Sequence, residues 1–280
     1  MELFSLHKFK SLGDANFSIS DYSKLKYGSG EVAKKFGYEL ADAIFEKYRA
    51  TILTNSTGII VFESAYSHVR NAASLITEFF IKRLNRLLIA SNGEHIMHGK
   101  INRTIPYIAD YGKLPMADRI RLLESDQFSI DKEFVNGKYL IFIDDVFITG
   151  THHKKIESML EFYRVPHHDP SKCLGVYYAE LEETPDMDPA IESLLNSEFI
   201  KSPMDLIKLI AKDSDYRVIV RSLKMILAAE PDMLSSILEM IPSKCLDEMY
   251  DLCLGEGYYK NISYATNFSI LQKAVLDESK

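Results

Sequence analysis

Apolar residues recur along the first two thirds of the chain at the spacings of helices and of buried strands. Residues 31–48 carry an apolar side chain at every fourth position, which predicts one helix with a single buried stripe. Residues 58–63, GIIVFE, are typical of a strand covered on both faces, and residues 69–87 return to helical periodicity. Residues 140–143 and 174–181 predict two further buried strands with a helix between them. Alternating strands and helices predict an α/β protein with a mainly parallel, twisted sheet flanked by helices.

The pattern changes after residue 182. The segment EETPDMDP at 182–189 is rich in proline and acid, and the chain beyond it has mainly helical periodicity. Ser202 followed by Pro203 is typical of a helix N-cap with proline at the first helical position. Pro231 and Pro242 are expected to start or interrupt later helices. We therefore expect an N-terminal helical segment at 1–50, an α/β core at 51–185 and a C-terminal helical module at 186–280.

Composition narrows the class of protein without naming a function. Hydrophobic residues make up 46% of the chain and charged residues 26%, as in an ordinary globular protein. The net charge of −7, with no dense run of Lys or Arg, argues against general nucleic-acid binding. Three widely spaced cysteines predict neither a disulfide framework nor a zinc site. Without a signal-peptide pattern or an apolar run of about 20 residues, we expect a cytoplasmic protein with no membrane partner.

Candidate chemistry is concentrated in Tyr139–His152, which reads YLIFIDDVFITGTH. A buried strand ends in Asp144 and Asp145, passes two apolar residues and enters a Thr-Gly-Thr turn that opens a helix. Gly150 permits a positive φ and close backbone approach, while amide N–H groups and threonine hydroxyls supply donors for an anion. Ligands of open α/β sheets bind at the carboxyl ends of the strands. The segment therefore predicts a phosphate-binding turn.

This run resembles the diphosphate-sugar signature of type I phosphoribosyltransferases. The resemblance implies the type I phosphoribosyltransferase fold and a site for 5-phosphoribosyl 1-diphosphate (PRPP) with Mg²⁺. It implies that Asp144 and Asp145 contact the ribose hydroxyls, directly or near the PRPP-bound magnesium. A buried strand with two acids and a Thr-Gly-Thr turn could also occur in any α/β protein, but the complete run favours PRPP. The residues implied to wrap the 5-phosphate are Ile148, Thr149, Gly150, Thr151 and His152.

Two of these positions depart from the family pattern. Ile148 stands where many purine-type members carry an acid or a hydroxyl, so a general base is absent there. His152 stands where many members have Thr or Ala, and it either adds a donor to the phosphate or only begins the helix. The departures weaken the link to the purine-salvage enzymes.

The loop that grips pyrophosphate in this family follows the first core strand. By position, the resemblance implies Ser64, Ala65 and Tyr66 for that loop. The alternative is an N-cap region, with Ser64 or Ser67 capping a helix that begins near His68. The sequence leaves both interpretations open.

A basic pair follows the next strand in HGKINR. The resemblance implies that Lys100 and Arg103 neutralise the diphosphate and so belong to the catalytic group, although either could be a solvated surface charge. The following segment is similar to the mobile loop that closes over the reacting centre in this family, or is an ordinary loop. Its polar side chains include Tyr107, Lys113, Arg119 and Arg121.

The resemblance implies transfer of a 5-phosphoribosyl group from PRPP to an unidentified nucleobase-like acceptor, with release of pyrophosphate. The acceptor hood would come from the first 50 residues and from the region after residue 186. Residues 20–41 resemble phosphoribosyltransferase-like proteins of bacterial stress and tellurite-resistance gene clusters. The alternative is a non-catalytic regulator of the same fold that senses PRPP or a nucleotide. A phosphate-binding hydrolase would need a nucleophile or extra metal-binding carboxylates that the sequence does not supply. A homodimer stays open.

Overall fold

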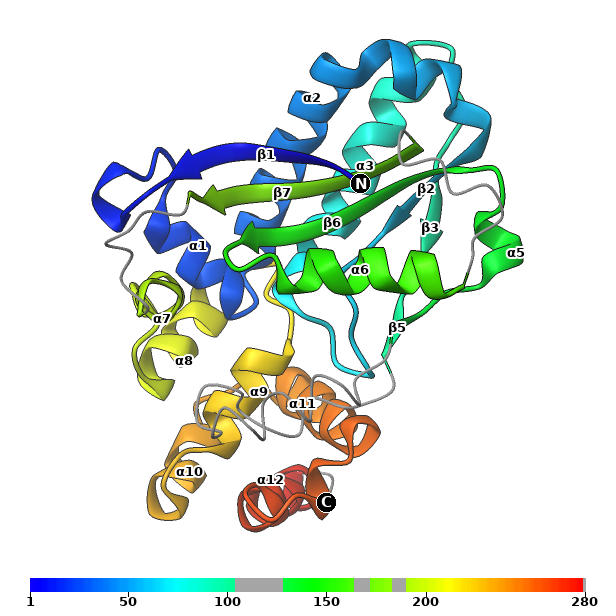
Figure 1. Cartoon of the computed structure of the whole chain (residues 1–280). Helices are drawn as coiled ribbons and strands as arrows, with labels where there is room; N and C mark the ends of the chain where they lie inside the picture. Colours follow the sequence, from blue (N-terminus) through cyan, green and yellow to red (C-terminus); the bar gives the residue numbers. More distant parts are fainter. Residues whose placement is uncertain (104–127, 164–171, 183–189, 279–280) are drawn as a thin grey trace.

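The computed structural model describes residues 1–103, 128–163, 172–182 and 190–278. Within these residues the centre of the protein is a five-stranded sheet in the order β1-β7-β6-β2-β3 (Figure 1). Every neighbouring pair of strands is parallel, which confirms the predicted α/β class. The strands are β1 (Glu2–Phe9), β2 (Ile59–Phe62), β3 (Met97–Gly99), β6 (Tyr139–Phe147) and β7 (Cys173–Leu181).

Helices cover both faces of the sheet. Helices α2 (Gly30–Thr54) and α3 (Ala72–Ala90) lie on one face, and α6 (Thr151–Phe162) lies on the other (Figure 1). Along β6, Ile141 and Ile143 belong to the hydrophobic core under α2 and α3, whereas Leu140 and Phe142 belong to the core under α6. Successive side chains of a strand point to opposite faces, so a strand buried on both sides must be apolar throughout.

The chain order of the strands fixes where a ligand can bind. From β2 the chain passes through α3 to β3 on one side, and from β6 it passes through α6 to β7 on the other side. The sheet therefore has its topological switch point between β2 and β6. Open α/β sheets bind ligands at this point, outside the carboxyl ends of the strands.

The start of the chain differs from the expected helical segment at residues 1–50. Glu2–Phe9 form the edge strand β1, paired in parallel with β7 from Glu2↔Leu174 to Phe9↔Leu181. Only Phe4 and Phe9 of this strand are buried, so its hydrophobic pattern is weak. The strand is stabilised by pairing with a distant segment, which local periodicity does not report. Helix α1 (Ile19–Lys26) follows, and the predicted helix at 31–48 is α2.

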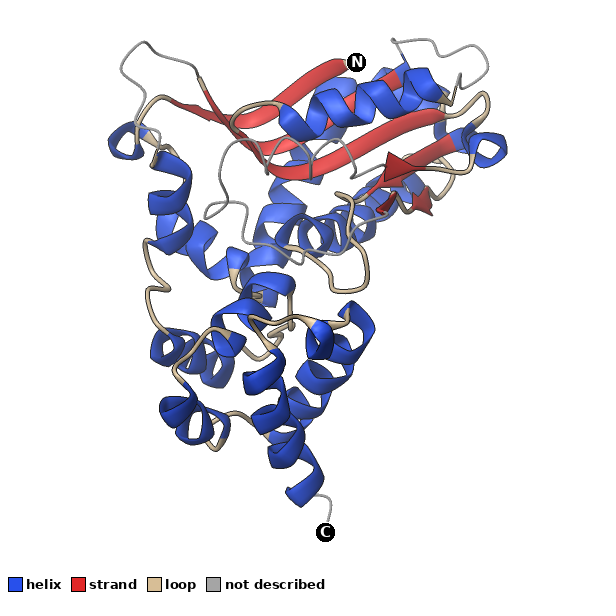
Figure 2. Ribbon diagram, turned by 60° about the horizontal axis from the view of Figure 1, so that its bottom comes forward, coloured by secondary structure: helices blue, strands red, loops and turns tan. Residues whose placement is uncertain are grey.

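The C-terminal third is helical, as expected (Figure 2). Ser202 caps α8 by accepting from the Asp205 amide, Pro203 is the first residue of that helix, and Pro231 begins α10, so these predictions are confirmed. The expected boundary near residue 186 lies outside the described residues. The helices are α7 (Ile191–Ser197), α8 (Pro203–Lys212), α9 (Val220–Leu227), α10 (Pro231–Leu238), α11 (Ser243–Glu256) and α12 (Ala265–Glu278).

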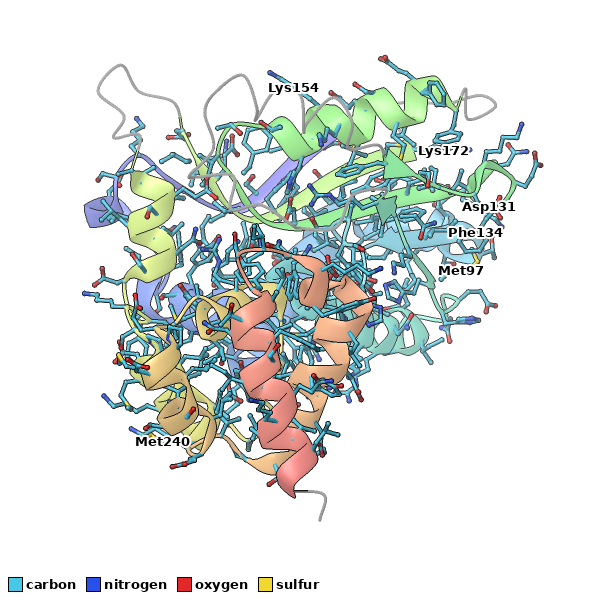
Figure 3. All side chains as sticks on the ribbon, turned by 90° about the horizontal axis from the view of Figure 1, so that it is seen from below. Met97, Asp131, Phe134, Lys154, Lys172 and Met240 are labelled. Atoms are coloured by element: carbon cyan, nitrogen blue, oxygen red, sulfur yellow. The ribbon has the colours of Figure 1, made fainter. Side chains whose placement is uncertain are left out.

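The division between hydrophobic cores falls after α7. Ile191 and Leu195 of α7 belong to the main core under α2 and α3, while α8–α12 share a second core. We call α8–α12 the helical module. Its Met240 lies on the far side of the molecule from Lys154 of α6 (Figure 3). The short elements are η1 (Leu12–Asp14), η2 (Ser56–Gly58), β4 (Asn102–Arg103), β5 (Phe128–Ser129), α5 (Lys132–Val135) and η5 (Tyr258–Lys260).

The helical module packs closely against the turn between α1 and α2. Arg217 donates its backbone N–H to the Gly28 carbonyl at 2.9 Å, and Ser29 Oγ donates to Asp213 at 2.5 Å. A Cβ added at Gly30 would lie 1.9 Å from the Asp215 carbonyl oxygen, so only glycine fits there. Among the described residues, no helix is long and apolar enough to cross a membrane.

Gly30→Ala tests this packing. Alanine in place of glycine usually stabilises a helix by up to about 1 kcal/mol, but the clash with Asp215 is expected to dominate. We expect the free energy of unfolding to fall by about 1–3 kcal/mol, as in other overpacked sites, measured by urea denaturation. Gly13→Ala is the control, because its Cβ would meet only Ser11 Oγ, at 3.8 Å. A Gly30→Ala variant as stable as the wild type would contradict the close packing.

Candidate phosphoribosyl site

The predicted site residues gather at one edge of the sheet. Ser64–Tyr66 follow β2, Lys100–Arg103 follow β3, and Ile148–His152 follow β6. Because all five strands run parallel, their carboxyl ends lie along the same edge. Segments far apart in the sequence are thus brought to the switch point between β2 and β6.

The two acids at the end of β6 point to opposite faces of the sheet. Asp144 is on the α6 side, where its Oδ2 lies 2.9 Å from Nδ1 of His152. Asp145 is on the α1 side, where its Oδ2 accepts from Nζ of Lys26 at 2.5 Å. This separation follows from the alternation of side chains along a strand. Each acid therefore has its own basic partner.

The Asp144–His152 pair favours the charged form of both groups. Burial opposes ionisation of Asp144, but the hydrogen bond and charge of His152 outweigh it and hold the pKa of Asp144 below its usual range. Desolvation likewise disfavours protonated His152, but Asp144 outweighs it and raises the pKa of His152 above 6.5. His152 thus lies in the first turn of α6, with its Nδ1 directed at Asp144.

Lys26 was not anticipated as a site residue. Its side chain is 15% exposed and that of Asp145 only 8%, so this ion pair is largely withdrawn from water. A buried carboxylate without a partner would cost several kcal/mol, and Lys26 removes that cost. A buried acid at the end of a strand does signal that a cation must be nearby, but the sequence does not say which one.

The Thr-Gly-Thr turn has the geometry expected of an anion-binding turn. Gly150 is the N-cap of α6 with a φ of 66°, in the left-handed region that favours glycine. The hydroxyls of Thr149 and Thr151 lie 2.8 Å apart and share a hydrogen bond. The amides of the first turn of α6 have no partner within the helix and suit an anion. Ile148 packs against the main core and offers no acid or base.

A cavity of ≈ 450 Å³ adjoins this turn on the side of β7. Glu157 on its wall pairs with the N-terminal amine of Met1 at 3.1 Å, and Glu180 pairs with Lys8 at 3.2 Å. The walls are therefore mixed in charge rather than basic. The lining residues are Phe147, Ile148, Thr149, Gly150, His153, Lys154, Glu157, Glu180, Leu181 and Glu182.

The loop after β2 does not serve as the cap of α3. Helix α3 begins at Ala72, and Asn71 caps it by accepting from the Ser74 amide. The alternative in which Ser64 or Ser67 capped a helix near His68 is therefore wrong. Ser64 and Ala65 are buried between the end of β2 and the helix.

Lys100 lies over this loop. Its Nζ is 4.3 Å from the centre of the Tyr66 ring and 3.4 Å from the carbonyl oxygen of Ser67, to which it donates. Arg103 is in β4, paired with Phe128 of β5, and its positive charge disfavours protonation of His152. Both basic residues therefore lie at the edge formed by the carboxyl ends of β2, β3 and β6, which we call the ligand edge. The segment with the expected closing loop, including Tyr107, Lys113, Arg119 and Arg121, lies outside the described residues.

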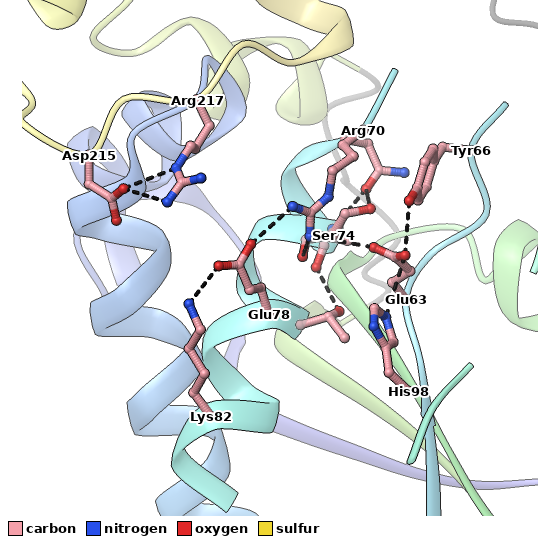
Figure 4. Close-up of polar contacts among 12 residues, drawn as sticks. Glu63, Tyr66, Arg70, Ser74, Glu78, Lys82, His98, Asp215 and Arg217 are labelled. Carbon is pink, nitrogen blue, oxygen red and sulfur yellow. Dashed lines mark hydrogen bonds and ion pairs between the residues drawn. The ribbon is translucent and has the colours of Figure 1, made fainter. Parts of the chain in front are cut away.

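A second buried acid, Glu63, follows β2 directly and was not singled out from the sequence. Its side chain is 3% exposed and is surrounded by Tyr66, Arg70 and His98 (Figure 4). Burial would raise the pKa of Glu63, but the hydrogen bond from His98 and the charge of Arg70 outweigh it and lower the pKa. Its sequence signal was an acid at the end of an otherwise apolar strand, the same signal as Asp144 and Asp145.

The described residues contain no group of three or more His, Cys, Asp or Glu side chains that could hold a metal ion. Magnesium usually takes one or two carboxylates and completes its shell with water and substrate phosphates. Asp144 and Asp145 are carboxylates at the switch point, one on each face of the sheet, and each is paired with a base of the chain.

The parallel sheet, the paired acids and the glycine turn at its switch point together define a phosphoribosyltransferase-type protein. The model of the family described as PRTase ComF-like matches residues 1–271, and the chain belongs to that family. The resemblance drawn from Tyr139–His152 is thereby confirmed, and the matched range includes most of the helical module. A search of the curated proteins found no match.

The Asp144–His152 pair predicts a pH-dependent stability. The contribution of His152 to the free energy of unfolding should be complete below its ordinary pKa of 6.5. It should be lost as the pH rises through the raised pKa. The contribution of Asp144 should be present above 3.8 and lost as the pH falls through its lowered value. We expect His152→Gln to reduce the free energy of unfolding most between these limits. The reduction should stay below about 1 kcal/mol because the ring is half exposed.

Urea denaturation of both proteins across this range measures the effect. His153→Gln is a matched control with the opposite sign, because burial lowers the pKa of His153. Wild-type stability relative to that variant should fall as the pH drops below 6.5. A His152→Gln difference that grows above pH 6.5 would contradict the ion pair.

Proposed function

We propose that this chain binds PRPP with Mg²⁺ at the carboxyl edge of β2, β3 and β6 and transfers its phosphoribosyl group to a nucleobase-like acceptor. The observation that carries the proposal is the paired acids of β6 followed by the left-handed Gly150 at the start of α6. The amides and hydroxyls of 148–152 would hold the 5-phosphate. On binding, Asp144 and Asp145 would exchange their bonds to His152 and Lys26, which hold them on opposite faces of the sheet, for hydrogen bonds from the ribose hydroxyls.

The remaining charges suit the departing group. Lys100 and Arg103 would stabilise negative charge on the diphosphate, as preorganised cations do in other transfer reactions. Asp144 and Asp145 would hold a magnesium ion bound with the diphosphate, and the ion would supply further charge neutralisation. In the reaction the ribose C1–O bond to diphosphate breaks, and the electron pair of an acceptor nitrogen forms the new bond. A proton on that nitrogen must be taken up by a base, and Ile148 cannot supply one.

A second candidate is a non-catalytic protein of the same family that senses PRPP or a nucleotide. Two observations favour it. Asp144 and Asp145 are each paired with a base of the chain itself, and the helical module contacts the loop after β2 through Glu256. Ligand binding that displaced these contacts could alter the surface of the module.

The acid pair gives the first test of the proposal. A double substitution, Asp144→Asn with Asp145→Asn, should weaken PRPP binding by about 10- to 100-fold, the size of a lost charged hydrogen bond. Isothermal titration with PRPP and Mg²⁺ measures this affinity. Asp251→Asn removes one charge from an exposed site on α11 and is the control, expected to bind like the wild type. Since Lys26 loses its partner in the double variant, thermal melting must show that the variant is folded at the titration temperature.

Pyrophosphate release separates the two candidates. With PRPP, Mg²⁺ and a panel of nucleobases and pooled metabolites, acceptor-dependent release establishes transfer. Tight binding without release in any pool supports the sensor. Equal PRPP affinity of the wild type and the double variant, or no binding by either, contradicts both.

A further inference from the structure

Glu63 is the most deeply buried carboxylate at the ligand edge. Its Oε1 accepts from the Tyr66 hydroxyl at 3.0 Å and lies 3.4 Å from Nε2 of His98, while its Oε2 lies 3.7 Å from the guanidinium of Arg70. Arg70 is held in turn by Glu78 at 3.0 Å and by the Ser74 carbonyl at 2.9 Å (Figure 4). These contacts tie the end of β2 to β3 and to α3. The position of Glu63 is therefore determined from several directions.

Tyr66 connects this buried acid to the ligand edge. Its hydroxyl is bound to Glu63, and burial together with Glu63 raises the pKa of Tyr66 to about 12, so the phenol stays neutral and donates. The face of its ring carries the ammonium group of Lys100 at 4.3 Å. Cations are attracted to the faces of aromatic rings. The Tyr66 ring, oriented by Glu63, thus fixes the position of the Lys100 charge together with the Ser67 carbonyl, to which Lys100 donates.

We infer that Glu63 is a positioning residue that acts through Tyr66 to hold Lys100 toward the diphosphate end of the ligand. This inference rests on the proposed function and deepens it, because it assigns the Glu63–Tyr66–Lys100 group to one part of PRPP. The 5-phosphate and ribose are expected to contact the β6 end of the edge instead. Loss of the group should therefore affect ligands that contain a diphosphate and spare ligands that lack one.

A direct electrostatic effect of Glu63 predicts the opposite change in ligand affinity. Glu63 is negative, so its neutralisation would strengthen binding of an anion if its charge acted directly. A positioning role predicts weaker binding, because Tyr66 and Lys100 lose their fixed geometry. The sign of the change distinguishes these effects.

The experiment measures affinities for PRPP, inorganic pyrophosphate and ribose 5-phosphate, each with Mg²⁺, by isothermal titration. Glu63→Gln and Tyr66→Phe should each weaken binding of PRPP and pyrophosphate by about two- to fivefold, the size of one exposed cation–π contact. Affinity for ribose 5-phosphate should stay within about twofold. Tyr66→Phe keeps the ring and the packing, so it remains informative if the buried Glu63→Gln variant is unstable.

Asp42→Asn is the matched control. It neutralises a carboxylate bound to an arginine, Arg83, outside the Glu63 network, and its affinities should equal those of the wild type. In a double-mutant cycle, Tyr66→Phe should add no further loss to Lys100→Met.

The outcomes separate the positioning role of Glu63 from the proposed function. Suppose that the wild-type protein binds all three ligands. The positioning role alone is overturned if the variants bind pyrophosphate normally or more tightly, or if they lose affinity for ribose 5-phosphate equally. Wild-type protein that binds none of the three overturns the proposed function and the positioning role together. Selective loss for the two diphosphate-containing ligands supports the inference.

Discussion

Burial of both faces of the parallel sheet is the constraint on which the rest of this protein depends. Helices α2 and α3 cover one face and α6 covers the other, so the side chains of the central strands are buried in two hydrophobic cores. On β2 and β6, buried acidic side chains are then confined to the carboxyl ends of the strands. The two buried acids at this edge, Glu63 and Asp145, and the partly buried Asp144 all stand within the last residues of a strand or directly after it.

Each of these acids is balanced by a base from a different element. Lys26 comes from α1, His152 from α6, and Arg70 from the loop before α3. The ion pairs therefore join the helical layers to the strand ends as well as neutralising charge. Removing one partner of such a pair destabilises the fold by more than the pair stabilises it, because the remaining charge stays buried. The same contacts that pair the acids with bases also hold this edge of the sheet in shape.

Local patterns were sufficient for the elements that bury a continuous stripe or run. The helix at 31–48, the strands at 58–63 and 174–181 and the Ser202–Pro203 cap were predicted because each signal lies within a few residues. Strand β1 was missed because its stability comes from pairing with β7, which is distant in sequence. The same limit applied to the site. The turn at 148–152 was readable from its own residues, whereas Lys26 and Arg70 reach their acids only through the tertiary fold.

The helical module also reaches the ligand edge, through a carboxylate of α11. Glu256 Oε2 accepts from the backbone amides of His68 and Val69 at 3.0 and 2.9 Å, directly after the loop at 64–66. Consecutive amides of this kind often form a binding site for a phosphate. Here the carboxylate of Glu256 occupies both amides. A ligand that used these two amides would first have to displace Glu256, so the C-terminal third of the protein would compete with it for this loop.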